Sequence, residues 1–222
     1  KAGNENTIAV KVVNPGKNSR WYSGSGLYRN VTLTVTDPVH VAVWGVHVNP
    51  GRITADQADL SIAVTVQNNL PATAQVTVKT RILGPGGTEG LPLQNDVAAD
   101  AGKTPTVLQQ GQVNKPALWS VDTPQQYLAE ITLERDGKVT DRYRQSFGIR
   151  SIAVSAAGGL LINGVPLELK GGCLHHDNGL LGSAAIDRAE VRRIQLMKAA
   201  GDNAIRTSHN PPSEAFLHAC DS

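Results

Sequence analysis

The sequence has few cysteines, almost no excess charge of either sign and no long apolar run, and each absence excludes a class of protein. Two cysteines, Cys173 and Cys220, are too few for a disulfide framework, so we expect free thiols, which leave the cellular compartment open. With 21 basic and 19 acidic side chains the net charge is +2, and no basic stripe suggests a nucleic-acid partner. No apolar run reaches the roughly 18 residues that a membrane-spanning helix needs.

What the chain does contain is enough for one large or two small domains. Its 222 residues include 40% apolar ones, an ordinary share that can form a core. The chain begins with Lys1 rather than Met, which we interpret as a cut point, ahead of which a targeting segment could have been removed.

Residues 1–37 contain two alternating runs, 7–13 and 31–36, which predict strands. Two strands do not make a stable domain, so we interpret this stretch as the end of a β-domain. The glycine-rich loop between the runs holds Trp21 and Tyr22. These rings suit either stacking on a sugar or filling the edge of a core, and both interpretations stay open.

Residues 38–150 predict an immunoglobulin-like β-sandwich. Alternating runs separated by turn residues recur without any helical pattern, and Asp136-Gly137 between two of them is a strong hairpin signal. The runs cover residues 39–48, 60–66, 76–83, 106–113, 127–134 and 139–147. Charged side chains are scattered over the polar faces, which indicates a scaffold rather than a catalytic domain.

Residues 151–222 change character and predict the start of a (β/α) barrel. Asn163-Gly164 indicates a hairpin, after which short strands at 167–173 and 204–206 flank a helix at 186–200, with a second helix near Ser213. Polar clusters follow both strands. Because the carboxyl ends of parallel barrel strands share one face, we expect these clusters to meet there.

The predicted helix is amphipathic and ends at Gly201, a residue suited to a left-handed cap. The side chains expected on its inner face are Ile186, Val191, Ile194 and Met197. Those expected to point elsewhere are Arg188, Glu190, Arg192 and Lys198.

A complete barrel needs roughly 250 residues, so we expect the chain to stop inside this domain. The barrel unit would then leave apolar faces uncovered. We expect residues 160–222 either to pack against the sandwich or to bury these faces in another copy, so a homo-oligomer is possible.

Several motifs resemble those of family-2 glycoside hydrolases, most closely bacterial β-galactosidases, over essentially the whole chain. They are SRWYSGSGLYR at 19–29, PALWSVDTP at 116–124, FGIR at 147–150, KGGCLHHD at 170–177 and NAIRTSHNPP at 203–212. The resemblance implies a mostly β chain in three parts: residues 1–37 end a sugar-binding jelly-roll domain, residues 38–150 form the sandwich, and residues 151–222 begin a truncated catalytic (β/α)8 barrel.

The resemblance also implies a retaining mechanism on terminal β-galactosides, with an acid and a nucleophilic carboxylate about 5 Å apart. Both are glutamates on later barrel strands, beyond Ser222, so the fragment is expected to be inactive alone. Arg206 would support the nucleophile by holding it ionised, as a guanidinium can. His175 and His209 would donate hydrogen bonds to the sugar hydroxyls, with Asp177 and Asn210 as further substrate ligands.

Other assignments stay open at this point. Asp177 could brace its loop instead, and His176 is interpreted as structural. Arg20 stands where some galactosidases carry an acidic sugar ligand, so no contact is assigned there. Imidazoles and a carboxylate could bind zinc at residues 175–177 and 209, but the resemblance explains them without a metal, and no cofactor is expected.

Two further functions compete with β-galactoside hydrolysis. One is a family-2 β-glucuronidase or β-mannosidase fragment, and the other is a non-catalytic carbohydrate-binding or interaction module on the sandwich. For each of the enzyme functions considered, the expected partner is a carbohydrate substrate. A bacterial location, whether cytoplasmic, periplasmic or secreted, is not decided by the sequence.

Overall fold

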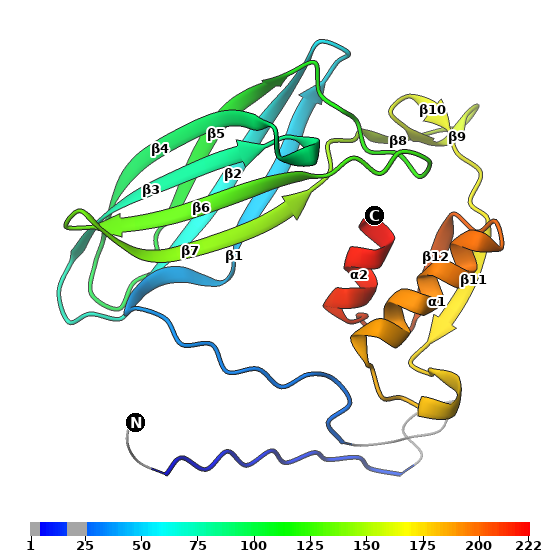
Figure 1. The fold of residues 1–222 in the computed structure, drawn as a ribbon, viewed down its shortest axis with the longest axis horizontal. Coiled ribbons are helices and arrows are strands. Elements are labelled where there is room, and N and C mark those ends of the chain that lie inside the picture. Colours follow the sequence, from blue (N-terminus) through cyan, green and yellow to red (C-terminus); the bar gives the residue numbers. More distant parts are fainter. Residues whose placement is uncertain (1–4, 17–25) are drawn as a thin grey trace.

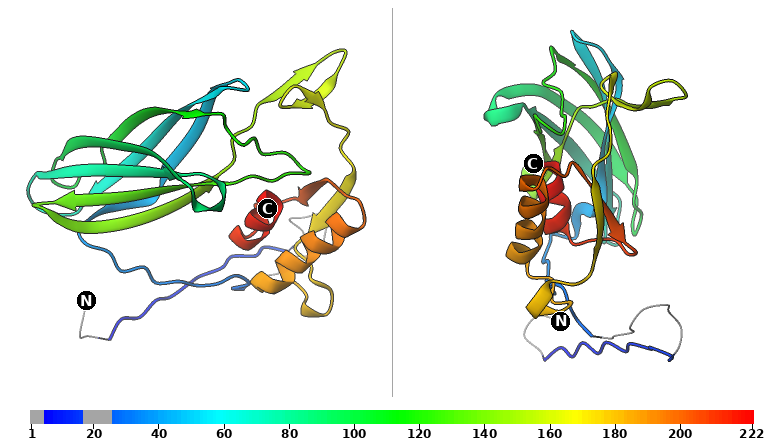
Figure 2. Two further views of the ribbon diagram at one scale, coloured as in Figure 1. Left: turned by 45° about the horizontal axis from the view of Figure 1, so that its top comes forward. Right: turned by 90° about the vertical axis from the view of Figure 1, so that its right-hand side faces the viewer.

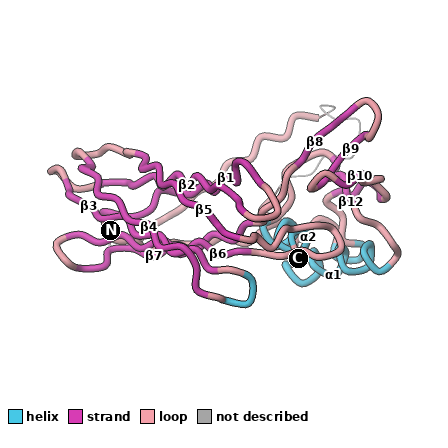
Figure 3. Tube along the Cα trace, turned by 90° about the horizontal axis from the view of Figure 1, so that it is seen from above, coloured by secondary structure: helices cyan, strands magenta, loops and turns pink. Residues whose placement is uncertain are grey.

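The computed structural model describes residues 5–16 and 26–222, and most of its regular structure is β (Figure 1). Seven long strands form a sandwich, which is followed by a small three-stranded sheet and a β–α–β–α unit. Seen from above, the two α-helices lie together at one end of the molecule (Figure 3). Within the described part, no helix is both long and apolar enough to cross a membrane.

The sandwich pairs a three-stranded sheet with a four-stranded one, as predicted for an immunoglobulin-like fold. The sheet orders are β1-β2-β5 and β4-β3-β6-β7, and every pairing is antiparallel. The strands are β1 (Val39–Ile53), β2 (Gln57–Asn68), β3 (Ala74–Leu83), β4 (Glu89–Ala99), β5 (Thr106–Asn114), β6 (Tyr127–Arg135) and β7 (Lys138–Phe147).

Alternation along the strands builds the core between the two sheets, because successive side chains point to opposite faces. Ile62, Val78, Ile131 and Leu133 are among its fully buried members. Asp136 and Gly137 both have positive φ, 51° and 72°, which is the geometry of a two-residue hairpin turn. The predicted hairpin between β6 and β7 is therefore confirmed.

Strand β4 was not among the predicted runs. It carries Pro92 and several polar residues, a composition that hides the strand pattern. The structure places β4 at an edge of its sheet, paired only with β3 among the described strands, with Pro92 opposite Arg81. A proline is tolerated there because an edge strand need not donate on its outer side.

The predicted strands at 7–13 and 31–36 are wrong for this structure. Both segments lie outside any ladder, and Ile8 and Leu33 are 84% and 87% exposed. A strand needs a neighbour to satisfy its backbone, and the described residues offer none to these segments. Residues 20–22, with Arg20, Trp21 and Tyr22, lie outside the described residues.

The small sheet that follows the sandwich consists of β8 (Ile152–Ser155), β9 (Gly159–Ile162) and β10 (Val165–Pro166). Asn163 and Gly164, with φ of 52° and 78°, form the predicted turn. The Asn163 side chain then joins this sheet to the sandwich, since its Nδ2 donates to the carbonyl of Trp119 at 2.9 Å.

The barrel unit has the predicted order of strand, helix, strand and helix. It contains β11 (Gly171–His175), a 3-10 turn η2 (Gly179–Leu181), α1 (Asp187–Ala199), β12 (Ala204–Ser208) and α2 (Glu214–Asp221), and β11 runs parallel to β12. The predicted first strand is shifted, because the backbone of Leu167 still bonds to Leu160 of the small sheet at 2.8 Å. Gly201, with φ of 98°, follows α1 as expected.

The inner face of α1 differs from the predicted one in two places. Ile194 is buried as expected, but Ile186 is 53% exposed and precedes the helix as its N-cap. Glu190, expected to point outward, is only 5% exposed. Periodicity assigns an acidic residue to the surface by default, whereas here polar partners from two loops hold Glu190 inside.

The barrel unit touches the sandwich at the end of α2, and the burial of its apolar faces in another copy stays a prediction. Trp119 of the sandwich donates through Nε1 to the Asp221 carbonyl at the end of α2, at 2.8 Å. The Arg150 guanidinium lies 4.2 Å from the centre of the Trp119 ring. Residues 26–30 lie beside the start of α1, where Tyr28 accepts from the Ala185 amide at 2.8 Å (Figure 2).

Candidate functional site

The candidate site forms where β11 and β12 end side by side. Their parallel register pairs Cys173 with Arg206 and His175 with Ser208. Side chains two residues apart on a strand share a face, so Cys173 and His175 project together, as do Arg206 and Ser208. The two polar clusters that the sequence separates by about thirty residues therefore meet at one edge, as the barrel topology predicts.

Arg206 is the centre of this cluster. Its Nη1 donates to Ser208 Oγ at 3.0 Å, and its Nη2 lies 3.3 Å from His209 Nδ1. Ser208 is 3% exposed and anchors one side of the guanidinium, whereas Arg206 itself is exposed. Nη1 also donates to Cys173 Sγ at 3.6 Å, so the planar group is oriented by contacts with both strands and with His209.

The two site histidines come together as predicted. The rings of His175 and His209 meet edge to face with centroids 5.6 Å apart, and both residues are exposed. The peptide between Ser208 and His209 is cis. Two neighbouring imidazoles beside a guanidinium provide N–H donors for hydroxyl groups of a ligand.

Cys173 belongs to the same cluster and was not assigned to the site by the sequence. Hydrogen bonding to Ser208 and then to Arg206 lowers the pKa of the Cys173 thiol, and the positive charge of Arg206 adds to this. Its spacing of two residues from His175 was the signal that places it on the same face of the strand. Both cysteines are free, as expected.

Asp177 and Asn210 lie in the loops after the two strands and are exposed. Asp177 braces its own loop, since its Oδ1 accepts from the Gly179 amide at 3.1 Å and its amide donates to the His175 carbonyl at 2.8 Å. These contacts favour the loop-bracing interpretation of Asp177. Asn210 sits in the bend before the two prolines.

His176 turns away from this cluster. Its ring packs edge to face on Tyr28, with centroids 5.9 Å apart. Burial, followed by the positive charge of Arg29, lowers the pKa of the His176 imidazole. In the part of the chain that the structure describes, no three His, Cys, Asp or Glu side chains are grouped to hold a metal ion.

A polar network lies behind the site and was missed by the sequence analysis. Glu190 and Arg193 of α1 bond to Asn178 in the loop after β11, and Glu190 also meets Ser213 before α2. Charged residues on an amphipathic helix usually read as surface residues, so no local pattern revealed this network.

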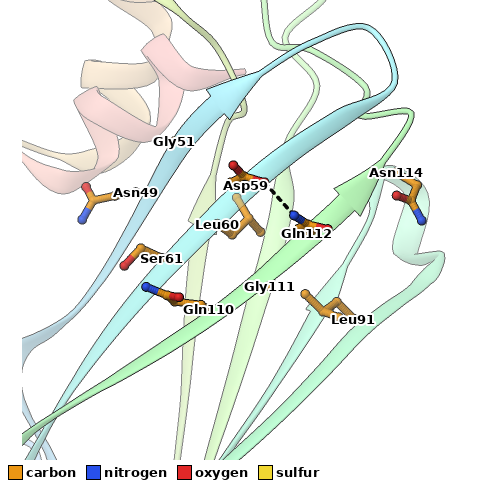
Figure 4. Close-up of a pocket in the computed structure, with 10 residues that line it drawn as sticks. All are labelled: Asn49, Gly51, Asp59, Leu60, Ser61, Leu91, Gln110, Gly111, Gln112 and Asn114. Carbon is orange, nitrogen blue, oxygen red and sulfur yellow. Dashed lines mark hydrogen bonds between the residues drawn. The ribbon is translucent and has the colours of Figure 1, made fainter.

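A concave region apart from this cluster lies on the outer face of the sandwich, over β1, β2 and β5 (Figure 4). It is a shallow groove of about 730 Å³, lined by Asn49, Gly51, Asp59, Leu60, Ser61, Leu91, Gln110, Gly111, Gln112 and Asn114. Its one carboxylate, Asp59, accepts from Gln112 Nε2 at 3.0 Å and lies 3.6 Å from the Arg52 guanidinium. Glycoside hydrolysis needs two carboxylates, and this groove offers one, which is already bonded to other side chains.

Two protein-family models match the chain, and together they cover the part that follows residue 38. The model for glycosyl hydrolases family 2 matches residues 39–150. The model for the TIM barrel domain of glycosyl hydrolases family 2 matches residues 152–222.

Individual relatives agree with these matches. The beta-galactosidase BoGH2A of Bacteroides ovatus is 40% identical over 97% of this chain and 26% of its own length. A beta-glucuronidase of Formosa agariphila is 29% identical over 100% of this chain and 25% of its own. The chain thus spans about a quarter of the length of these relatives.

Solved structures show the same likeness. A family member from Bacteroides cellulosilyticus superposes with a TM-score of 0.87 and 45% identity, over 93% of this chain and 28% of that one. Bacteroides uniformis beta-glucuronidase 2, covalently bound to cyclophellitol-6-carboxylate aziridine, superposes with a TM-score of 0.79 and 30% identity, over 84% of this chain and 23% of that one.

Proposed function

The chain belongs to glycosyl hydrolase family 2, and on this premise we propose that it supplies the first strands of the catalytic barrel of a retaining β-galactosidase. The domain boundaries follow the proposed organisation: residues 1–37 end a jelly-roll, 38–150 form the sandwich and 151–222 begin the barrel. The observation that carries the proposal is the convergence of Arg206, His175 and His209 at the ends of two adjacent parallel strands.

The two catalytic carboxylates are glutamates on later barrel strands, beyond Ser222, in a longer parent protein. The carboxylates of this chain nearest the site are engaged elsewhere: Asp177 braces a loop and Glu190 is buried in a network on α1. Neither offers the pair about 5 Å apart that retention requires. The covalently bound ligand in the beta-glucuronidase from Bacteroides uniformis agrees with a family chemistry that proceeds through a covalent intermediate.

In this proposal the residues of the chain orient and stabilise rather than transfer protons. Arg206, held from behind by Ser208, pairs with the nucleophilic carboxylate and keeps it ionised. His175 and His209 donate hydrogen bonds to hydroxyls of the sugar, and these bonds matter most where they strengthen in the transition state. Asp177 and Asn210 border the sugar from the two loops.

The support for a galactoside is the 40% identity to a relative named beta-galactosidase over nearly the whole chain. Relatives named beta-glucuronidase are 29–31% identical, and further relatives named beta-galactosidase are 28% identical. Assays of the parent protein with p-nitrophenyl β-galactoside, β-glucuronide and β-mannoside decide among the three. If kcat/KM is highest on the glucuronide or the mannoside, that glycoside replaces the galactoside as the proposed substrate.

Arg206→Ala in the parent protein is expected to lower kcat by about 100-fold or more, the usual cost of removing one strong electrostatic group from such a site. Arg192→Ala, on the exposed side of α1, is the matched control and is expected to keep wild-type rates. Circular dichroism checks that both variants are folded. Wild-type turnover by Arg206→Ala would refute the role given to this residue.

The groove on the sandwich supports a second candidate, a non-catalytic carbohydrate-binding module. Amide side chains such as Gln110 and Gln112 in Figure 4 can bond to hydroxyl groups. Calorimetric titration of the 222-residue chain with lactose separates the candidates. Binding abolished by Gln112→Ala and kept by His209→Ala would favour the groove, whereas the reverse would favour the barrel site.

A further inference from the structure

A partly buried ion pair, Glu190 and Arg193, lies behind the candidate site, and the proposed reaction does not use it. Glu190, in the first turn of α1, has a side chain that is 7% exposed, and the side chain of Arg193 is 17% exposed. Arg193 Nη1 lies 3.6 Å from Glu190 Oε1. A buried pair is weak evidence for stability, because removing two charges from water can cost more than their attraction returns. The groups that this pair connects indicate a different role.

Arg193 and Glu190 anchor the loop that follows β11. Arg193 Nη2 donates to the carbonyl of His175 at 2.8 Å, and its Nη1 donates to Asn178 Oδ1 at 3.2 Å. Asn178 Nδ2 in turn donates to Glu190 Oε1 at 2.9 Å. The backbone of His175 is therefore tied directly to α1.

Glu190 also reaches the loop that follows β12. Ser213 Oγ donates to Glu190 Oε2 at 3.4 Å, and the same hydroxyl caps α2 by accepting from the Phe216 amide at 3.2 Å. Pro211 and Pro212 lie between Ser213 and His209, and proline rings hold φ near −65°. The two prolines therefore restrict the backbone between Ser213 and His209, so the position of Ser213 limits the positions that His209 can take.

We propose that Glu190 and Arg193 are positioning residues that set the placement of His175 relative to His209. One carboxylate holds both loops from behind, one through Asn178 and Arg193 and the other through Ser213. The inference rests on the proposed function, because it concerns the same site. It adds that two residues of α1 keep the imidazoles of His175 and His209, which lie on different loops, in a fixed relative position.

Glu190→Ala in the parent protein removes both links. We expect kcat/KM to fall on the order of 100-fold, mainly through kcat, because a displacement of about 1 Å in a positioning group costs that much. Glu190→Gln keeps an acceptor for Asn178 and a polar group beside Ser213, and is expected to restore kcat to within about tenfold of wild type. Arg188 lies on the exposed side of the same helix, where its Nη1 donates to Gln195 Oε1 at 2.9 Å. Arg188→Ala is the control and is expected to keep wild-type rates.

Coupling between the loops provides a readout that a purely structural role would not move. Of the two loops, Arg193 contacts only the one that follows β11. Arg193→Ala should nevertheless increase amide exchange in residues 175–178 and also in residues 209–213 of the 222-residue chain. In the parent, Glu190→Ala combined with Arg193→Ala should cost no more in kcat than Glu190→Ala alone, because one network is already broken. Additive losses in kcat would contradict the network.

The outcomes separate this inference from the proposed function. If the wild-type parent hydrolyses none of the three glycosides, the proposed function fails, and the exchange experiment alone decides whether the loops are coupled. If the parent is active and Glu190→Ala keeps wild-type kcat/KM, the positioning role is overturned while the function stands. Should Glu190→Ala fail to fold, Arg193→Lys replaces it: a single ammonium cannot hold His175 and Asn178 as a fork does, so wild-type kcat in that variant overturns the inference.

Discussion

The chemistry of individual residues at the site is set by neighbours that come from the other strand. Cys173 and Arg206 face each other only because β11 and β12 are parallel and in register. That contact, together with Ser208, lowers the pKa of the Cys173 thiol, whereas burial and the charge of Asp221 raise the pKa of the Cys220 thiol. Two cysteines that look equivalent in the sequence therefore differ in the fraction present as thiolate.

Cys173 is expected to react with iodoacetamide several-fold faster than Cys220 at pH 7.5, because the thiolate is the reactive species and its fraction rises as the pKa falls. Peptide mass spectrometry at short labelling times measures both rates. Ser208→Ala removes the largest cause of the lowered pKa and should slow labelling at Cys173 without affecting Cys220. Equal rates at the two thiols in the wild-type chain would contradict the assignment.

At the scale of elements, close approach of β11 and β12 depends on a missing side chain. A Cβ placed on Gly171 would lie 1.7 Å from the carbonyl oxygen of Ala204, which is backbone and cannot move aside. At Gly172, one residue later in the same strand, a Cβ would meet no heavy atom within 4 Å. The first glycine is required by the parallel pairing, and the second is not required by any contact.

Gly171→Ala is expected to separate the two strands and to destabilise the barrel unit by about 1–3 kcal/mol, as overpacking usually does. Hydrogen exchange of residues 171–175 and 204–208 measures the change locally. Gly172→Ala is the matched control and should leave the protection of both strands near the wild-type level. Equal protection in the two variants would show that the pairing does not need the close approach at Gly171.

At the scale of the whole molecule, the apolar core lies between the sheets of the sandwich, and the barrel unit contributes little core of its own. The buried apolar residues described in that unit are Ala185, Ile194 and Phe216. A link of this unit to the sandwich lies at the end of α2, where Trp119 donates to the Asp221 carbonyl and is itself covered by Arg150.

Trp119→Ala is expected to lower the free energy of unfolding by about 1–3 kcal/mol, less than the loss of a fully buried aromatic ring. It should also increase amide exchange in α2 while leaving β2 and β6 protected, because those strands belong to the core. Trp44→Ala serves as the control, since Trp44 is 78% exposed and its loss should change stability by at most about 0.5 kcal/mol. Unchanged exchange in α2 on loss of the Trp119 indole would disprove the docking role.

The sequence by itself determined those features that depend on neighbours along the chain. Alternation identified six of the seven sandwich strands, Asp136-Gly137 marked a turn of the sandwich, and Asn163-Gly164 marked a turn of the small sheet. Periodicity located α1 between two strands. Such signals are local because turn geometry and side-chain periodicity are properties of a few consecutive residues. The family resemblance, rather than a local pattern, assigned binding roles to Arg206, His175 and His209, and these roles stay predictions.

Only the tertiary structure decided the features that need a distant partner. The segments at 7–13 and 31–36 alternate like strands but have no neighbour among the described residues to pair with. Glu190 is buried because Asn178 and Ser213 approach it from two different loops. Cys173 acquires its lowered pKa from Ser208 and Arg206 across a parallel pairing. Each of these features depends on whether a residue distant in the chain lies close in space, and a local sequence pattern holds no information on that.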